Sequence, residues 1–169
     1  MPVDRESYRQ LAGSFPTGVT VVTTCDADGV PKGLTTQSFI GLSTEPPLIL
    51  VAIDKTSRTL VSLERSRTFV INFLKVGADE VSTKFASKSD DKFAGLAWRP
   101  STVADGAPIL HESSVAYAEC AVIKREDVGD HVIFIGRVDG GEVLGGVPLM
   151  YHRRIYAGWP EEKPAPRAI

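Results

Sequence analysis

Runs of apolar and β-branched residues, separated by polar turn segments, dominate the first third of the chain and predict a series of strands. The runs at 18–24, 32–41 and 48–53 are rich in Val, Ile, Leu and Thr, which is the composition of strands. The segment DADG at 26–29 is typical of a turn, and two prolines precede the third run. Because these links are short, we expect the three strands to follow one another as an antiparallel meander.

Helical spacing of apolar residues predicts three short helices. Asp4 is a suitable N-cap for a helix that ends near Ser14, with Gly13 at its stop. A second helix is expected over 57–66, with its leucines facing inward, and a third over 78–86.

Further strands are expected in the second half of the chain. TFVINFL at 68–74 predicts a buried strand, and 115–124 with 131–143 predict a long hairpin joined by REDVGD. A polar connector, SKSDDKFAG, precedes this hairpin, and a last short strand is expected at 149–157. The Pro-rich, charged end at 160–169 predicts a loose tail, which leaves a single domain at 1–159.

Many short strands with few helices favour a mainly β protein, a closed or nearly closed antiparallel barrel with helical decoration. Short loops connect antiparallel strands but not parallel ones. No GxGxxG follows a strand, so the sequence does not favour a Rossmann sheet.

Composition narrows the classes of partner. The chain has 169 residues, 43% hydrophobic and 24% charged, with a net charge of −2, which predicts one globular domain and argues against nucleic acid or an anionic membrane as the main partner. No apolar stretch approaches the roughly 20 residues of a membrane span, and the acidic start MPVDRESYRQL is unlike a signal peptide. We therefore expect a cytoplasmic location.

Cysteine and histidine usage argues against a metal site. Cys25 and Cys120 stand alone, each beside strand-like residues, and are interpreted as free thiols. The three histidines show no metal-ligand spacing with either cysteine.

Candidate chemistry begins with KTSRTL at 55–60, where a strand ends and a helix starts. A helix N-terminus offers unpaired N–H groups to an anion, and Arg58 could add a bidentate phosphate contact. The competing interpretation is ordinary capping of the helix by Thr56 or Ser57.

Two other segments carry polar groups where a ligand could bind. In GLTTQSFIGLS at 33–43, hydroxyl and amide side chains interrupt a strand-like run, which suits a planar polar ring but also fits a solvent-facing strand. His131 begins a strand after a Gly-Asp turn, where it could touch a ligand or be an ordinary surface histidine. No catalytic triad or carboxylate pair can be argued from spacing. The residues favour a binder of an anionic, planar cofactor without naming it.

Eight segments in one order resemble a known family, the short-chain flavin reductases with an FMN-binding split barrel, which are the reductase components of two-component monooxygenases. The resemblance covers residues 5 to 158. The segments are FPTGVTVVT at 15–23, GLTTQSFIGLSTEPPL at 33–48, KTSRT at 55–59, FVINFL at 69–74, KFASKSDDKFAG at 84–95, the Glu119-Cys120 pair, GDHVIFIGRV at 129–138 and PLMYHRRIY at 148–156.

The resemblance implies an NADH-dependent reductase of FMN or FAD that supplies reduced flavin to a partner monooxygenase, and a homodimer with the flavin near the subunit interface. It places a flavin site on Thr35, Thr36, Ser38, Phe39, Ala52, Ile53, Asp54, Ser57, Arg58, Thr59, Asn72, Phe73, Phe85 and Lys92. It places the nicotinamide nucleotide near His131, Tyr151, Arg153 and Arg154. The two arginines could also receive the 2′-phosphate of NADPH.

Hydride transfer between stacked rings needs orientation more than acid–base chemistry, so His131 is expected to position the nicotinamide. Two alternatives remain open at this stage. One is a flavin-binding protein without reductase turnover, and the other is an FMN-dependent reductase of another acceptor, such as a corrinoid.

Overall fold

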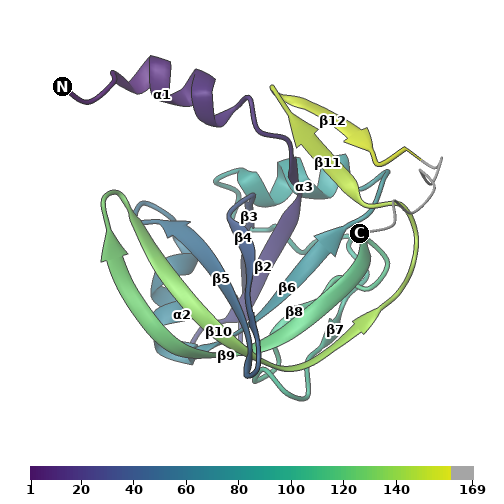
Figure 1. Ribbon diagram of the computed structural model, residues 1–169. Coiled ribbons are helices and arrows are strands. Elements are labelled where there is room, and N and C mark those ends of the chain that lie inside the picture. The colour runs from purple at the N-terminus through teal and green to yellow at the C-terminus, as the bar shows by residue number, and fades with distance from the viewer. Residues whose placement is uncertain (161–169) are drawn as a thin grey trace.

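The computed structural model describes residues 1–160, so the tail predicted at 160–169 lies, apart from Pro160, outside the described residues. A seven-stranded antiparallel sheet in the order β3-β2-β6-β9-β10-β5-β4 curls into a barrel (Figure 1). Its strands are β2 (Thr20–Cys25), β3 (Pro31–Thr36), β4 (Phe39–Thr44), β5 (Pro47–Asp54), β6 (Thr68–Leu74), β9 (Ser114–Val128) and β10 (His131–Val143). The predicted mainly β architecture is confirmed, and every pair of neighbouring strands in this sheet is antiparallel.

Two smaller sheets and three helices complete the described chain. The small strands are β1 (Thr17–Gly18), β11 (Leu149–His152) and β12 (Ile155–Gly158) in one sheet, and β7 (Arg99–Pro100) and β8 (Pro108–Ile109) in the other. The helices are α1 (Arg5–Ala12), α2 (Thr59–Ser66) and α3 (Asp79–Ala86), each within two residues of its predicted start.

The barrel closes where β3 passes into β4. These strands were predicted as one, but the chain breaks at Gln37 and Ser38, and β3 and β4 lie at opposite edges of the sheet. The expected meander is therefore wrong at this link. The chain breaks here because the Ser38 side chain replaces a neighbouring strand beside β5. The Ser38 hydroxyl accepts the Ala52 N–H at 2.9 Å and donates to the Ala52 carbonyl at 2.7 Å.

Helix α1 begins as predicted but lies apart from the core. Asp4 Oδ1 accepts the N–H groups of Glu6 and Ser7, both at 2.9 Å, which satisfies two free donors of the first turn. No residue of α1 is buried, and the helix projects from the barrel on the side of the β11–β12 hairpin (Figure 1).

Two segments near the end of the chain differ from the sequence prediction. The expected connector REDVGD is mostly strand, because β9 runs to Val128 and the turn is only Gly129 and Asp130. The last expected strand is instead a hairpin that turns at Arg153 and Arg154, whose φ angles are 49° and 67°.

Apolar side chains fill the barrel and the space beneath α3. Phe69, Val51 and Phe134 belong to the cluster inside the barrel, and the leucines of α2 that were predicted to face inward are buried against it. A second cluster, which includes Phe85, joins α3 to β2, β6 and β11. No helix within residues 1–160 is long and apolar enough to cross a bilayer.

Candidate functional site

A cavity of about 410 Å³ opens beside the seam of the barrel, where β3, β5, α3 and the β11–β12 hairpin meet. We call it the central cavity. It brings together six of the residues that the sequence predicted for the site. These are Thr35, Thr36, Ser38, Ala52, His131 and Tyr151.

Hydroxyl groups hold the wall of the central cavity in place through the backbone. Thr35 Oγ1 donates to the carbonyl of Ser82 on α3 at 2.6 Å. Thr36 and Ser38 hydroxyls lie 2.7 Å apart, and Ser38 is further bonded to the Ala52 backbone. Since these hydroxyls are engaged with the protein itself, they fix the shape of the wall on which a ligand would rest.

His131 stands at the rim of the central cavity, opposite Asp54 in the β5–β10 ladder. Its Nδ1 atom lies 2.7 Å from Asp130 Oδ1. This hydrogen bond lowers the pKa of Asp130, and the backbone N–H of Thr56 lowers the pKa of Asp54. The histidine is half-exposed and borders the central cavity, so a ligand there could contact it.

A separate cavity of about 150 Å³, the cationic cavity, lies where α2 begins. Lys32, Arg58 and Lys92 border it from three different segments. Arg58 occupies the N-cap position of α2 without a side-chain cap, and the first turn of this helix contains no acidic residue. Ser57 Oγ accepts the Thr59 N–H at 3.3 Å. The arrangement favours an anion.

Within the cationic cavity, the polar side chains differ in how free they are. Lys92 Nζ donates to the carbonyls of Phe85, at 2.8 Å, and Gly33, at 3.1 Å, and burial lowers its pKa, with the nearby Arg58 adding to the effect. Thr59 is buried and donates to the same Gly33 carbonyl at 3.1 Å. Arg58 forms an ion pair with Asp90.

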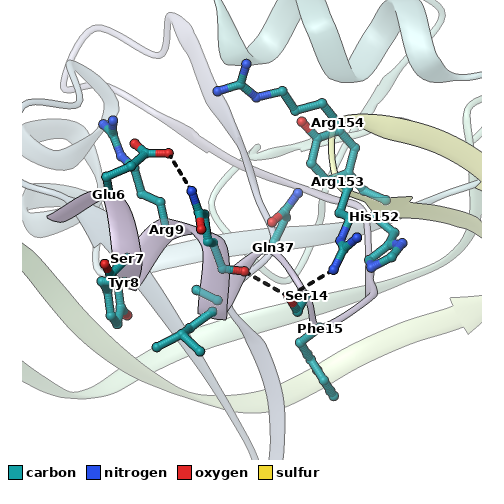
Figure 2. A pocket seen from close by; sticks show the side chains of 15 residues that line it. Glu6, Ser7, Tyr8, Arg9, Ser14, Phe15, Gln37, His152, Arg153 and Arg154 are labelled. Carbon is teal, nitrogen blue, oxygen red and sulfur yellow. Dashed lines mark hydrogen bonds between the residues drawn. The ribbon is translucent and has the colours of Figure 1, made fainter. Parts of the chain in front are cut away.

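A larger cavity, about 1030 Å³, lies between α1 and the β11–β12 hairpin, and Tyr151, Arg153 and Arg154 border it. Figure 2 shows Arg153 reaching toward Ser14, whose Oγ accepts from Arg153 Nη2 at 3.4 Å, whereas the guanidinium of Arg154 points away. This helix-side cavity shares Gln37 and Tyr151 with the central cavity.

Phe39 and Phe73 are brought together in a fourth cavity of about 260 Å³, which Gln37 also borders. Their rings meet edge to face, with centroids 4.8 Å apart. This fourth cavity lies between β4, β6 and the segment at 15–20.

Three predicted site residues have side chains that lie in the interior of the protein and border none of the cavities described above. Ile53 belongs to the barrel core, and Phe85 to the cluster beneath α3. Asn72 is fully buried: its Nδ2 donates to the Val21 carbonyl at 3.2 Å and its Oδ1 accepts the Leu110 N–H at 2.7 Å. Buried amides need such partners, so the role of Asn72 seen here is structural.

Sequence reasoning missed several residues of the central cavity. Gln37 borders the central cavity, the helix-side cavity and the fourth cavity. Tyr156 and Ser82 also line the central cavity, and their hydroxyl oxygens lie 2.9 Å apart. Gln37 stood inside the quoted TTQSF motif, but nothing local indicated that the chain changes sheet edge there.

The fold and these cavities define a β-barrel that can hold an elongated ligand along its seam, with cations at either end. The family described as "Flavin reductase like domain" matches residues 12–160. The chain belongs to this flavin reductase family, as the eight sequence segments predicted.

Curated relatives and solved structures agree with this assignment. A "Flavin reductase (NADH)" of Kitasatospora aureofaciens is 44% identical over 99% of this chain and 88% of its own length. The reductase subunit of a flavin-dependent monooxygenase from Mycobacterium tuberculosis is 42% identical over 97% of this chain and 87% of its own.

Among solved structures, a homologue of nitrilotriacetate monooxygenase component B from Mycobacterium thermoresistibile superposes with a TM-score of 0.91, at 38% identity, over 98% of this chain and 92% of that one. The NADH:FAD oxidoreductase of Streptomyces globisporus, in complex with NAD and FAD fragments, gives a TM-score of 0.87 at 31% identity, over 94% of each chain. The predicted split-barrel fold of flavin reductases is thereby confirmed.

Proposed function

We propose that this protein uses NADH to reduce FMN or FAD and delivers the reduced flavin to a separate monooxygenase. The observation that carries the proposal is that Gln37 and Tyr151 border both the central and the helix-side cavity. Two ligands bound in these cavities would contact the same two side chains and so lie next to each other. Hydride transfer between stacked rings requires such proximity. The names of the relatives, a reductase that uses NADH and a monooxygenase reductase subunit, support the same activity.

The flavin ring is assigned to the central cavity. A volume of about 410 Å³ is within the range of small-molecule sites, and the wall of backbone and hydroxyl groups suits a planar ring with polar edges. The ribityl chain would run along β3 toward Arg58 and Lys92, which border the cationic cavity, and toward Ser57, the neighbour of Arg58 in the chain. Gly33 borders the cationic cavity and Thr35 borders the central cavity. These two residues lie two positions apart on β3, which separates them by about 7 Å.

The nicotinamide ring is assigned to the place where the central cavity meets the helix-side cavity, beside Tyr151 and with His131 at the rim. Arg153 and Arg154 of the helix-side cavity are then available to the phosphates of the dinucleotide. A bound flavin supplies the hydride acceptor, while these residues orient the dinucleotide and exclude water. The groups that line the central cavity include no carboxylate. His131 therefore acts as a positioning group in this assignment.

We further propose that the protein is a homodimer. Tyr8, Leu11 and Phe15 are spaced to share one side of the N-terminal segment, and their side chains are 63%, 66% and 72% exposed. An eight-residue helix is marginal by itself in water, so α1 needs a surface to pack on. A second copy of the chain would supply that surface and complete the helix-side cavity.

The deciding experiment is NADH oxidation by purified protein with and without added free flavin. Reductase activity predicts catalytic consumption that depends on FMN or FAD, with NADPH used less well. Flavin binding without NADH consumption would favour a carrier. NADH consumption that requires a different acceptor would favour the reductase of another substrate.

A further inference from the structure

The connector between α3 and Lys92 is built to hold one carboxylate over the cationic cavity. Ser87 Oγ accepts the Ser89 N–H and Ser89 Oγ accepts the Asp91 N–H, both at 3.2 Å. Lys92 Nζ then fastens the end of the connector to the Phe85 carbonyl at 2.8 Å. Because alternate residues are fixed by these contacts, the position of the intervening Asp90 is set by the local structure.

Asp90 meets Arg58 from across the cationic cavity. The carboxylate Oδ1 is paired with Arg58 Nη1, although 93% of the Asp90 side chain is exposed. Both residues border the cationic cavity together with Lys32 and Lys92. A carboxylate and a phosphate engage a guanidinium through the same donors, so Asp90 stands where a phosphate bound by Arg58 would have to approach.

We propose that Asp90 competes with the flavin phosphate for Arg58 and thereby makes the flavin a weakly held, exchangeable ligand. The inference rests on the proposed function, since it takes Arg58 as the phosphate contact. An exposed ion pair contributes little to stability, so an incoming phosphate can displace Asp90. The displaced carboxylate stays tethered nearby and repels the phosphate, which favours release of the flavin to a partner enzyme.

Asp90 could instead serve as a latch, that is, a residue whose ion pair with Arg58 only holds the connector in place. This role predicts the opposite change in flavin affinity when the carboxylate is removed. Loss of a latch would loosen Lys92 and the α3 side of the site, so binding of every flavin would weaken. Loss of a competitor strengthens binding only of flavins that carry a phosphate. FMN and riboflavin, which share a ring and differ by this phosphate, separate the two roles.

The test compares Asp90→Asn with the wild-type protein by fluorescence titration of FMN and riboflavin. The expected result is a Kd for FMN about three- to fivefold lower, with the Kd for riboflavin unchanged. Asp91→Asn is the matched control, because it removes the same charge one residue away, where the side chain accepts the Ala94 N–H at 3.2 Å. This control should change neither Kd.

Arg58→Ala completes the experiment. It should weaken FMN binding, and in its background Asp90→Asn should no longer strengthen it. An FMN affinity unaffected by Arg58→Ala would contradict the phosphate assignment and hence the proposed site. Weaker FMN binding in Arg58→Ala, together with unchanged or weaker FMN binding in Asp90→Asn, would overturn the competition and leave the proposed function standing.

Discussion

The ring of Phe85 lies against the backbone of Gly33, so closely that a Cβ atom at Gly33 would come within 2.7 Å of Phe85 Cε1. This contact seats α3 directly on β3. It also fixes the position of the Ser82 carbonyl on α3, which accepts a hydrogen bond from the Thr35 hydroxyl. The glycine therefore determines how one wall of the central cavity is placed against the other.

We expect Gly33→Ala to lower the free energy of unfolding by about 1–3 kcal/mol, because the buried Phe85 ring has no room to yield. Urea denaturation followed by circular dichroism measures the change. Gly41→Ala is the control, since a Cβ there would meet nothing within 4 Å. Equal stability of the two variants would show that the Phe85 ring can move aside.

Asn72→Ala should destabilise the protein by about 2–4 kcal/mol, because it leaves the Leu110 N–H without its side-chain acceptor. Gln10→Ala, which removes an exposed amide that donates to Glu6 at 3.4 Å, should have almost no effect. At temperatures where Asn72→Ala remains folded, its KM for flavin should match the wild-type value. A large rise in that KM would mean that Asn72 contacts the ligand after all.

His131→Ala should lower kcat/KM for NADH by a factor of tens to hundreds, about 2–3 kcal/mol, because one positioning contact is lost. Flavin affinity should stay unchanged. Stopped-flow reduction of bound flavin across NADH concentrations is the measurement, with His111→Ala as the control histidine outside the cavities described above. Reduction at the wild-type rate would remove the nicotinamide from this part of the barrel.

Leu11→Asp should convert the proposed dimer into monomers, because it places a charge on the exposed apolar side of α1. Val61→Asp places the same charge on an exposed apolar residue of α2, away from the helix-side cavity, and should leave the dimer intact. Sedimentation velocity at micromolar concentration distinguishes them. A wild-type monomer that still binds flavin would contradict the dimer.

Both cysteines should resist alkylation in the native protein. Burial raises the pKa of Cys120 to about 12 and also raises the pKa of the half-buried Cys25. At pH 8 almost all of the Cys120 side chain is then the unreactive thiol. Mass spectrometry after iodoacetamide treatment should show little modification, and modification of both thiols once urea is added. Rapid native labelling of Cys120 would show that its strand opens readily.

Sequence patterns predicted helices and strands well where each residue is stabilised by its neighbours in the chain or by burial in the apolar core. The run at 68–74 was identified to the residue because apolar side chains fill both faces of β6. The extension of β9 through Arg125 was missed, because charged residues usually mark a loop. Its support is distant: Arg125 pairs with Glu64 on α2 at 2.7 Å.

The candidate site was likewise predicted only where it did not depend on contacts between distant parts of the chain. Nine of the residues named by family resemblance border the central or the cationic cavity, but the resemblance could not say which way each side chain points. Asn72 and Phe73 are neighbours on β6, so they face opposite sides of the sheet, and only the packed structure shows that Asn72 has its partners in the core. Gln37 was missed because its importance arises from closure of the barrel.

The link at Gln37 and Ser38 has a consequence for the order of assembly during folding. It joins β3 and β4, which are adjacent in sequence but terminate the sheet on opposite sides. These two edges can come together only after the intervening strands have found their places, so the seam is among the last parts of the barrel to form. Since the central cavity is lined by the end of β3, by the link itself and by Ala52 of β5, a flavin bound there would contact segments that come together only when the barrel closes. Flavin binding during refolding would therefore report the completed barrel.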